Sequence, residues 1–164
     1  MNSSATGLDR AFAALTYVMP LTSALTAYEI TFRWFLVEQA PAVARVFETL
    51  LIPFSPLIAI ERSQVLVLAV FIALFAFVVR NTDISRFIRY NVLQAILVSF
   101  VLSVCIRLIG FLNPVLPVVM FDALINVLFL GGMGIVIYGV FQSITGRYAE
   151  IPTVSDAINM QLPY

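Results

Sequence analysis

Long runs without a charged residue are the feature that most constrains this chain. Residues 63–79 and 123–146 contain no Asp, Glu, Lys or Arg and consist mainly of aliphatic and aromatic side chains. A helix needs about 20 such residues to cross the hydrocarbon core of a bilayer. Of the 164 residues, 62% are hydrophobic and 11% are charged, whereas soluble domains are about 45–50% apolar and about 25% charged. The sequence therefore predicts an all-α integral membrane protein with one domain, and it excludes a free-standing soluble enzyme.

The residue types that the chain lacks limit its chemistry. It has no His, all 9 of its basic residues are Arg, and Cys105 is its only cysteine. His is the commonest general base and metal ligand, and Schiff-base catalysis needs Lys. The sequence also contains no HExxH motif and no glycine-rich phosphate loop. We therefore expect no enzyme and no cofactor or metal, and the net charge of zero argues against nucleic acid as a partner.

The positions of the charges predict four spans. They lie at about 10–30, 63–80, 88–110 and 122–146. With an even number of crossings, both ends of the chain lie on the same side of the membrane. The tail at 147–164 is polar but contains Ile, Val, Met and Tyr, so we expect it to pack along the membrane surface or against a partner.

The segment at about 39–60 is predicted to be interfacial or re-entrant. Its apolar stretch 49–60 is short and contains Pro53 and Pro56, which suits such a segment better than a crossing. Upstream of it, apolar residues recur at helical spacing on one face, as in an amphipathic helix that lies on a bilayer. The alternative is a fifth crossing, which would place the two chain ends on opposite sides.

The loop after the second span is rich in arginine, because Arg80, Arg86 and Arg89 follow one another closely. Cytoplasmic loops carry an excess of basic residues, so we expect this loop and both termini on the cytoplasmic or stromal side. Arginine binds phosphate and carboxylate groups bidentately. The three arginines, with Asn91 and Gln94 after them, are candidates for binding a lipid head group or a partner subunit.

Polar residues within the predicted spans form two further groups of candidates. Arg107, Asp122 and Asn126 lie near the turn between the last two spans, and Ser99 and Ser103 precede Arg107 at four-residue spacing. Ionisable groups in a span are candidates for function. These residues either form a structural pair or solvated helix ends at the membrane surface, or they line a polar path.

Small residues recur along the last span. Because small side chains let helices approach closely, we expect them to pack against a helix of this chain or of another protein, with a ligand site as the alternative. The residues are Gly131, Gly132, Gly134, Gly139 and Ser143.

Four stretches resemble a known family. They are LDRAFAALTYVMPL at 8–21, PFSPLIAIERS at 53–63, VVRNTDISRFIRYNVLQAIL at 78–97 and GRYAEIPTVSDAINMQ at 146–161. Together they resemble the Tic-twenty family, whose chloroplast members are small four-helix subunits of the translocon at the inner envelope. The resemblance points to the arginine-rich block and, in the tail, to docking through Tyr148, Glu150 and Pro152.

The resemblance implies a non-enzymatic subunit that acts in protein translocation or in the assembly of a membrane complex. Its expected partners are membrane lipids and either larger membrane proteins or further copies of the chain. The N-terminal MNSSATGLDR does not resemble a transit peptide, and with the lack of Lys this favours a cyanobacterial homologue in the plasma or thylakoid membrane. The alternative is a small-solute transporter or channel formed by an oligomer.

Overall fold

In the computed structural model, residues 5–152 and 154–162 are described, and every regular element in these ranges is helical. The first part is a long bent segment made of α1 (Gly7–Thr16), α2 (Val18–Ala27), the π-helical turn η1 (Tyr28–Phe32) and α3 (Arg33–Gln39). The middle part comprises α4 (Pro41–Leu51), the 3-10 turn η2 (Ile52–Phe54), α5 (Ser55–Arg62), α6 (Gln64–Leu74) and the π-helical turn η3 (Phe75–Val79). Two long helices, α7 (Arg86–Leu112) and α8 (Val118–Ile144), precede the short α9 (Val154–Gln161).

Local signals set the helix boundaries. The Thr6 hydroxyl accepts a hydrogen bond from the Asp9 amide at 3.2 Å, and the Asp9 carboxylate accepts one from the Thr6 amide at 2.9 Å, so the two residues cap α1. Ser85 caps α7 by accepting from the amide of Ile88. After α8, Gly146 has a φ of 73°, the left-handed conformation that glycine adopts without strain at a helix end.

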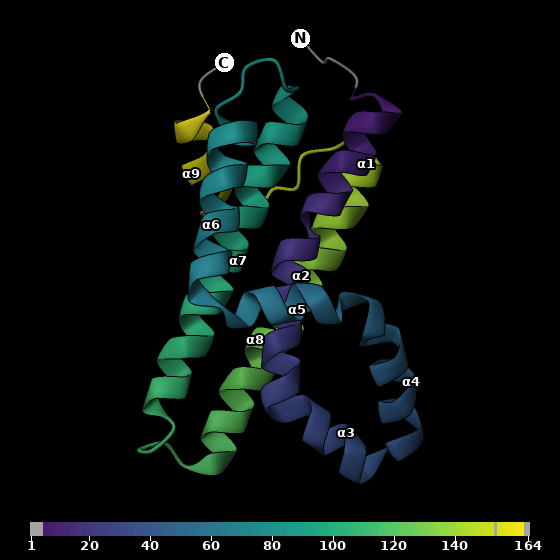
Figure 1. The fold of residues 1–164 in the computed structure, drawn as a ribbon, viewed down its shortest axis with the longest axis vertical. Helices are drawn as coiled ribbons and strands as arrows, with labels where there is room; N and C mark the ends of the chain where they lie inside the picture. Colours follow the sequence, from purple (N-terminus) through teal and green to yellow (C-terminus); the bar gives the residue numbers. More distant parts are fainter. Residues whose placement is uncertain (1–4, 153, 163–164) are drawn as a thin grey trace.

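The elements α1, α2, α7 and α8 form the body of the molecule, since α1 and α2 pack against both α7 and α8. Figure 1 shows these helices running roughly along the long axis. The start of α1, the loop 80–85, the end of α8 and α9 lie at one end, which we call the terminal end. The turn between α3 and α4 and the turn between α7 and α8 lie at the other, the hairpin end.

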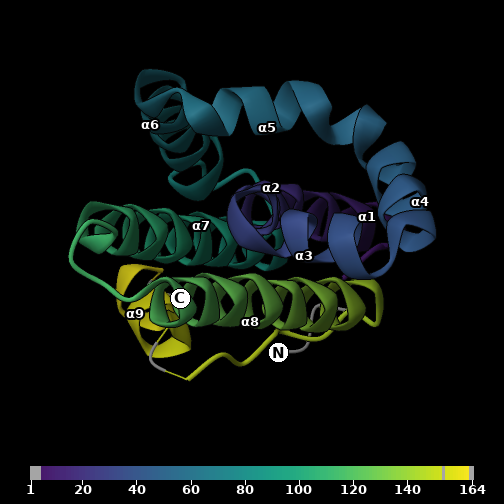
Figure 2. The same ribbon diagram turned by 90° about the horizontal axis from the view of Figure 1, so that it is seen from below.

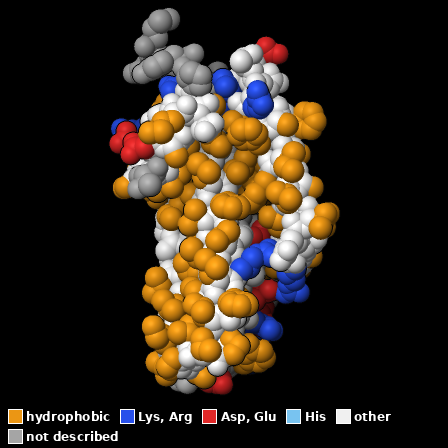
Figure 3. Space-filling view, turned by 90° about the vertical axis from the view of Figure 1, so that its left-hand side faces the viewer, with side chains coloured by type: hydrophobic (Ala, Val, Ile, Leu, Met, Phe, Trp, Pro, Cys, Tyr) orange, Lys and Arg blue, Asp and Glu red, His pale blue; other side chains and the backbone are white. Residues whose placement is uncertain are grey.

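The expected all-α membrane fold is confirmed. Four helical segments are long and apolar enough to cross a membrane. They are Gly7–Gln39, Pro41–Arg62, Arg86–Leu112 and Val118–Ile144. Figure 3 shows hydrophobic side chains over most of one face, with charged side chains at the top and again along the right-hand edge in the lower half.

Residues 41–79 make the second pass along the bundle, and their helices differ in length from the spans expected from the charges. Gln64–Val79 is an apolar helix shorter than 18 residues, whereas the upstream Pro41–Arg62 meets the length and hydropathy criteria with 22 residues. In Figure 1, α4 rises from the hairpin end, α5 runs across the bundle, and α6 continues to the terminal end. Residues 41–79 therefore make one stepped pass along the bundle, from the hairpin end to the terminal end.

Helix lengths agree with this reading of the stepped pass. The 11 residues of α4 extend about 16 Å, and the 11 residues of α6 with the 5 of η3 extend about 24 Å, at about 1.5 Å per residue. Their sum matches the roughly 40 Å of α7 with its 27 residues. The lateral α5 between them packs on α2. Figure 2 shows α4 and α5 as an arch beside α2 and α3, on the side away from α8.

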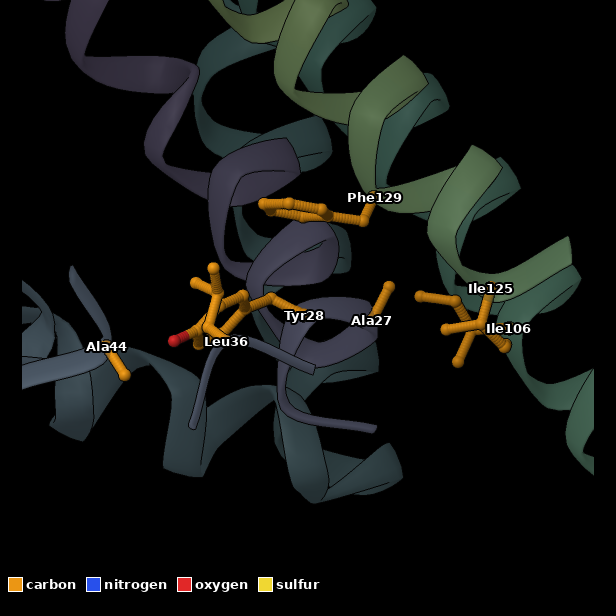
Figure 4. Close-up of a cluster of buried hydrophobic side chains, with 7 residues drawn as sticks. All are labelled: Ala27, Tyr28, Leu36, Ala44, Ile106, Ile125 and Phe129. Carbon is orange, nitrogen blue, oxygen red and sulfur yellow. The ribbon is translucent and has the colours of Figure 1, made fainter. Parts of the chain in front are cut away.

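Aromatic packing joins the arch to the bundle near the hairpin end. The Tyr28 ring lies 5.6 Å from that of Phe129 on α8 and 5.4 Å from that of Phe47 on α4, measured between centroids. Aromatic pairs at such distances add to the stability gained by burying the rings. Figure 4 shows this cluster, whose buried members are Ala27, Tyr28, Leu36, Ala44, Ile106, Ile125 and Phe129.

Candidate functional site

A buried hydrogen-bond network connects four parts of the chain near the terminal end. The Tyr17 hydroxyl lies 3.2 Å from both Asn91 Oδ1 and Gln94 Oε1, and the Ser143 hydroxyl donates to Asn91 Oδ1 at 3.0 Å. Gln94 Nε2 donates to the carbonyl of Ala149 at 2.9 Å. These five residues are at most 1% exposed. The bonds, which we call the terminal network, therefore connect the α1–α2 junction, α7, α8 and the tail.

Two of the expected head-group residues thus have an internal position. Asn91 and Gln94 are 0% exposed, so neither reaches a lipid or a partner in this arrangement. The three-residue spacing places both on the face of α7 that packs against α1 and α8. Their polar groups stabilise the bundle because each side chain is hydrogen-bonded within it.

The three arginines divide into two kinds. Arg89 is half-buried, and its Nε donates to the carbonyl of Val79 at 2.8 Å, so it caps the end of η3. Arg80 and Arg86 are exposed at the terminal end. The Ser85 hydroxyl donates to Asp9 Oδ1 at 3.1 Å, which ties this loop to the start of α1.

The tail folds back along α7. The ring of Tyr148 meets the rings of Phe87 and Tyr90 edge-on, with centroid distances of 5.3 and 4.8 Å. Further along, Ile158 and Leu162 are buried against η3 and α7. Apolar residues of the tail are therefore placed by packing as well as by the Gln94 bond to its backbone.

A cavity of about 520 Å³ lies between the start of α7 and the tail. It is lined by Arg86 from α7 and by all three tail residues that the resemblance singled out, Tyr148, Glu150 and Pro152. Asp156 of α9 adds a second carboxylate. We call this cavity the terminal pocket. It brings together a residue of the arginine-rich block and residues of the tail, which were singled out separately in the sequence.

We expect Gln94→Leu to release the tail. The substitution removes the bond to the Ala149 carbonyl and leaves that buried carbonyl with weaker partners. Chymotrypsin should then cut after Tyr148 about fivefold faster in detergent-solubilised protein, as followed by mass spectrometry. Gln64→Leu is the matched control, because Gln64 is exposed at the start of α6. Equal cleavage rates in the two variants would show that the bond does not hold the tail.

The polar residues near the hairpin end do not form a single site. Arg107 is exposed and Asp122 is half-buried. Among the described residues, ion pairs join Arg33 to Glu48 and Arg62 to Glu29, and none joins Arg107 to Asp122. Asn126 Oδ1 accepts a hydrogen bond from the Thr31 hydroxyl at 2.7 Å, which links α8 to η1.

Glu61 is a buried polar residue that the sequence reasoning missed. Its side chain lies between α2, α5 and α7, where it is 9% exposed and accepts hydrogen bonds from Ser23 and Ser103. Ser99, the other serine of the expected stripe, is fully buried, and its hydroxyl has no partner among the described atoms. The signal in the sequence was Ser103, because a hydroxyl in an apolar helix can bond to a polar group of another segment.

The glycines of α8 also divide into two kinds. A Cβ at Gly132 would lie 2.9 Å from Cβ of Ala24, and one at Gly139 would overlap the ring of Tyr17. At Gly131 and Gly134 an added Cβ meets nothing within 4 Å. Within the described chain, only Gly132 and Gly139 of these four therefore permit a close approach. Gly132 faces α2, and Gly139 faces the α1–α2 junction.

Comparison with known proteins identifies the family. Residues 6–158 match the family model described as "Chloroplast import apparatus Tic20-like". The chain belongs to the Tic20 (Tic-twenty) family. It is 39% identical to a Tic20 family protein from Synechocystis sp., over 99% of this chain and 98% of that relative. It is 29% identical to Protein TIC 20-II, chloroplastic, from Arabidopsis thaliana, over 94% of this chain and 72% of the plant protein.

A third relative extends the comparison. The Tic20 family protein Ycf60 from Gracilaria tenuistipitata var. liui is 29% identical over 94% of this chain and 76% of that protein. The resemblance recognised in the sequence stretches is thus confirmed. In this Tic20 family member, the stretch 78–97 supplies both the buried Asn91 and Gln94 and the exposed Arg80 and Arg86.

Proposed function

We propose that this chain is a non-enzymatic subunit of a membrane protein complex that acts in protein translocation or in the assembly of membrane proteins. The observation that carries the proposal is the family match over residues 6–158, whose description names an import apparatus. The similarity to Protein TIC 20-II, chloroplastic, over 94% of the chain supports the same class of function. The Tic20 fold would then serve as a membrane-embedded platform for larger partners.

The terminal pocket is the part of the surface best suited to dock a partner. Its lining combines the guanidinium of Arg86 with the carboxylates of Glu150 and Asp156 and with two tyrosine rings. Arginine and tyrosine are enriched among the residues that dominate protein interfaces. The three charged residues are exposed, so a partner segment of mixed charge could reach them. We place this end on the cytoplasmic or stromal side, as the arginine bias predicts.

We expect Arg86→Gln to release the partner without affecting membrane insertion. Losing a hydrogen bond to a charged group costs about 1.5–3 kcal/mol, which corresponds to about a 10- to 100-fold weaker complex. The measurement is purification of the tagged full chain in mild detergent, with the co-purifying proteins quantified by mass spectrometry. Arg107→Gln is the matched control, because Arg107 is also exposed but lies near the hairpin end.

Two outcomes would contradict this proposal. If Arg86→Gln inverts the topology or leads to degradation, the side chain acts in insertion or folding and not in docking. If the purified chain forms only homo-oligomers that conduct a solute in liposomes, the transporter reading replaces the subunit reading. A stoichiometric partner that is retained by Arg107→Gln and lost by Arg86→Gln supports the subunit.

A further inference from the structure

A second cavity, of about 380 Å³, lies under the arch formed by α4 and α5. Its lining comes from the bent segment on one side and from the arch on the other, and includes Tyr28, Glu29, Arg33, Glu48 and Arg62. We call it the arch cavity. It is separate from the terminal pocket, with which it shares no lining residue.

Two ion pairs cross the arch cavity. In one the arginine lies on the bent segment, and in the other the arginine lies on the arch. Arg33 of α3 donates to Glu48 of α4 at 2.9 Å, and Arg62 of α5 donates to Glu29 of η1 at 2.7 Å. The four charges sum to zero, and each is already neutralised by its neighbour. Their side chains are 31–65% exposed, so the pairs remain open to a ligand.

The ion pairs satisfy the charges but leave hydrogen-bonding capacity unused. Both Arg33 contacts go to the single oxygen Oε1 of Glu48, and the Glu29 contact uses only Oε2. A guanidinium has five N–H donors, and a carboxylate has about four acceptor positions. Donors and acceptors therefore alternate around the cavity, with capacity to spare on both partners of each pair.

The hydroxyl of Tyr28 is the most specific sign of a ligand. Tyr28 is 1% exposed and lines the cavity, yet its hydroxyl oxygen is buried and has no hydrogen-bond partner among the described atoms. Figure 4 shows the hydroxyl oxygen of Tyr28 pointing away from Ile125 and toward α4, the helix to which Ala44 belongs. A buried polar group without a partner costs about 1–3 kcal/mol, so a ligand that bonds to it recovers this energy.

The lining selects for a neutral ligand with several hydroxyl groups. An anion would lie close to the carboxylates of Glu29 and Glu48, and a cation would lie close to the guanidinium groups of Arg33 and Arg62, so a ligand of either charge meets a like charge. A polyol can donate to the carboxylates and accept from the guanidinium groups and the phenol without breaking either ion pair. We propose that the arch cavity binds the sugar head group of a neutral glycolipid.

The surroundings favour a lipid over a dissolved sugar. The cavity lies between Gly7–Gln39 and Pro41–Arg62, two segments apolar enough to cross a membrane. Trp34, Leu50 and Ile52 on these segments are 59–66% exposed. Acyl chains attached to the sugar would find an apolar surface next to it, which a free sugar cannot use. This binding is independent of the partner docking proposed above.

Native mass spectrometry of the full chain, purified in a polyoxyethylene detergent that carries no sugar, tests this proposal. Monogalactosyl diacylglycerol, phosphatidylglycerol and diacylglycerol with identical acyl chains are added in separate titrations. We expect a one-to-one adduct with the galactolipid that forms at least tenfold more tightly than with the other two. Methyl galactoside at millimolar concentration should leave this adduct in place.

Two variants connect the adduct to the cavity. Tyr28→Phe keeps the ring packing and removes one oxygen, and we expect about fivefold weaker galactolipid binding, the effect of about one hydrogen bond. The double variant Glu29→Gln with Arg62→Gln should weaken it further. Glu38→Gln with Arg45→Gln is the matched control, since both residues are exposed and do not line the cavity.

Three results would overturn the proposal. Equal binding of phosphatidylglycerol would show that acyl chains alone make the contact. Displacement by methyl galactoside would show that the site takes a dissolved sugar. Unchanged galactolipid binding by Tyr28→Phe would place the ligand elsewhere, and this result remains informative even if the double variant does not fold.

Discussion

Tyr17→Ala is expected to lower the free energy of unfolding by about 3–5 kcal/mol, the usual cost of removing a large buried aromatic side chain. Tyr17 is 1% exposed, its ring faces Gly139 of α8, and its hydroxyl contacts Asn91 and Gln94 of α7. One side chain thus joins the α1–α2 junction to both long helices. Thermal unfolding of detergent-solubilised protein, followed by size-exclusion chromatography, should show Tm lower by about 10 °C.

Two variants separate the ring from the hydroxyl and from general effects. Tyr17→Phe keeps the ring and should cost only about 1–2 kcal/mol, because the amide groups of Asn91 and Gln94 keep their own bonds to backbone carbonyls. Tyr138→Ala removes the same side chain at a position that is 38% exposed and should lower Tm much less. Similar losses of Tm for Tyr17→Ala and Tyr138→Ala would contradict the central position of Tyr17.

Gly139→Ala is expected to have the second-largest effect on stability, a loss of about 1–3 kcal/mol through overpacking. The added methyl group would occupy the position of the Tyr17 ring, which is confined by the terminal network and cannot move aside without breaking its bonds. Tm in the same assay should fall by about 5 °C. Alanine normally favours a helix over glycine by about 1 kcal/mol, so a fall in Tm isolates the steric effect.

The chain supplies controls for this substitution as well. Gly134→Ala lies on the same helix with nothing within 4 Å of the new methyl group, so Tm should stay constant or rise slightly. In the background of Tyr17→Ala, the ring is gone and Gly139→Ala should no longer lower Tm. A penalty that persists in the double variant would mean that another neighbour fills the space beside Gly139.

The fold class was predictable from the sequence because charges end the apolar runs. The charge-free residues 90–106 lie inside α7, which begins four residues before them and ends six residues after them. The run 123–146 overlaps α8 except for its last two residues, and α8 begins five residues before it. The stepped pass at 41–79 was not predictable in detail. A helix broken at Pro53 and Pro56 has the same hydropathy whether its apolar face meets lipid or α2, and only packing decides between them.

The candidate site was predictable as a set of residues and not as an arrangement. Arg86 and Glu150 were singled out in separate stretches, and the contact between α7 and the tail brings them to one pocket. Asn91 and Gln94 were assigned to the surface because polar residues near a span end often face head groups. The polar side chains Asn91, Gln94 and Ser99 of α7 are all buried, so in this apolar helix they mark the face that meets the bundle, a sign that the assignment to head groups did not use.

The shortness of α4 and α6 has a consequence for how this protein enters a membrane. At about 16 and 24 Å, neither helix alone covers the roughly 30 Å of hydrocarbon that an independently inserted segment must cross. The carboxylate of Glu61 in the lateral α5 is sheltered by Ser23 of α2 and Ser103 of α7, residues on either side of it in the chain. We therefore expect the second pass to complete its insertion only after α7 has been synthesised, so that membrane integration of this chain would not follow the order of its sequence.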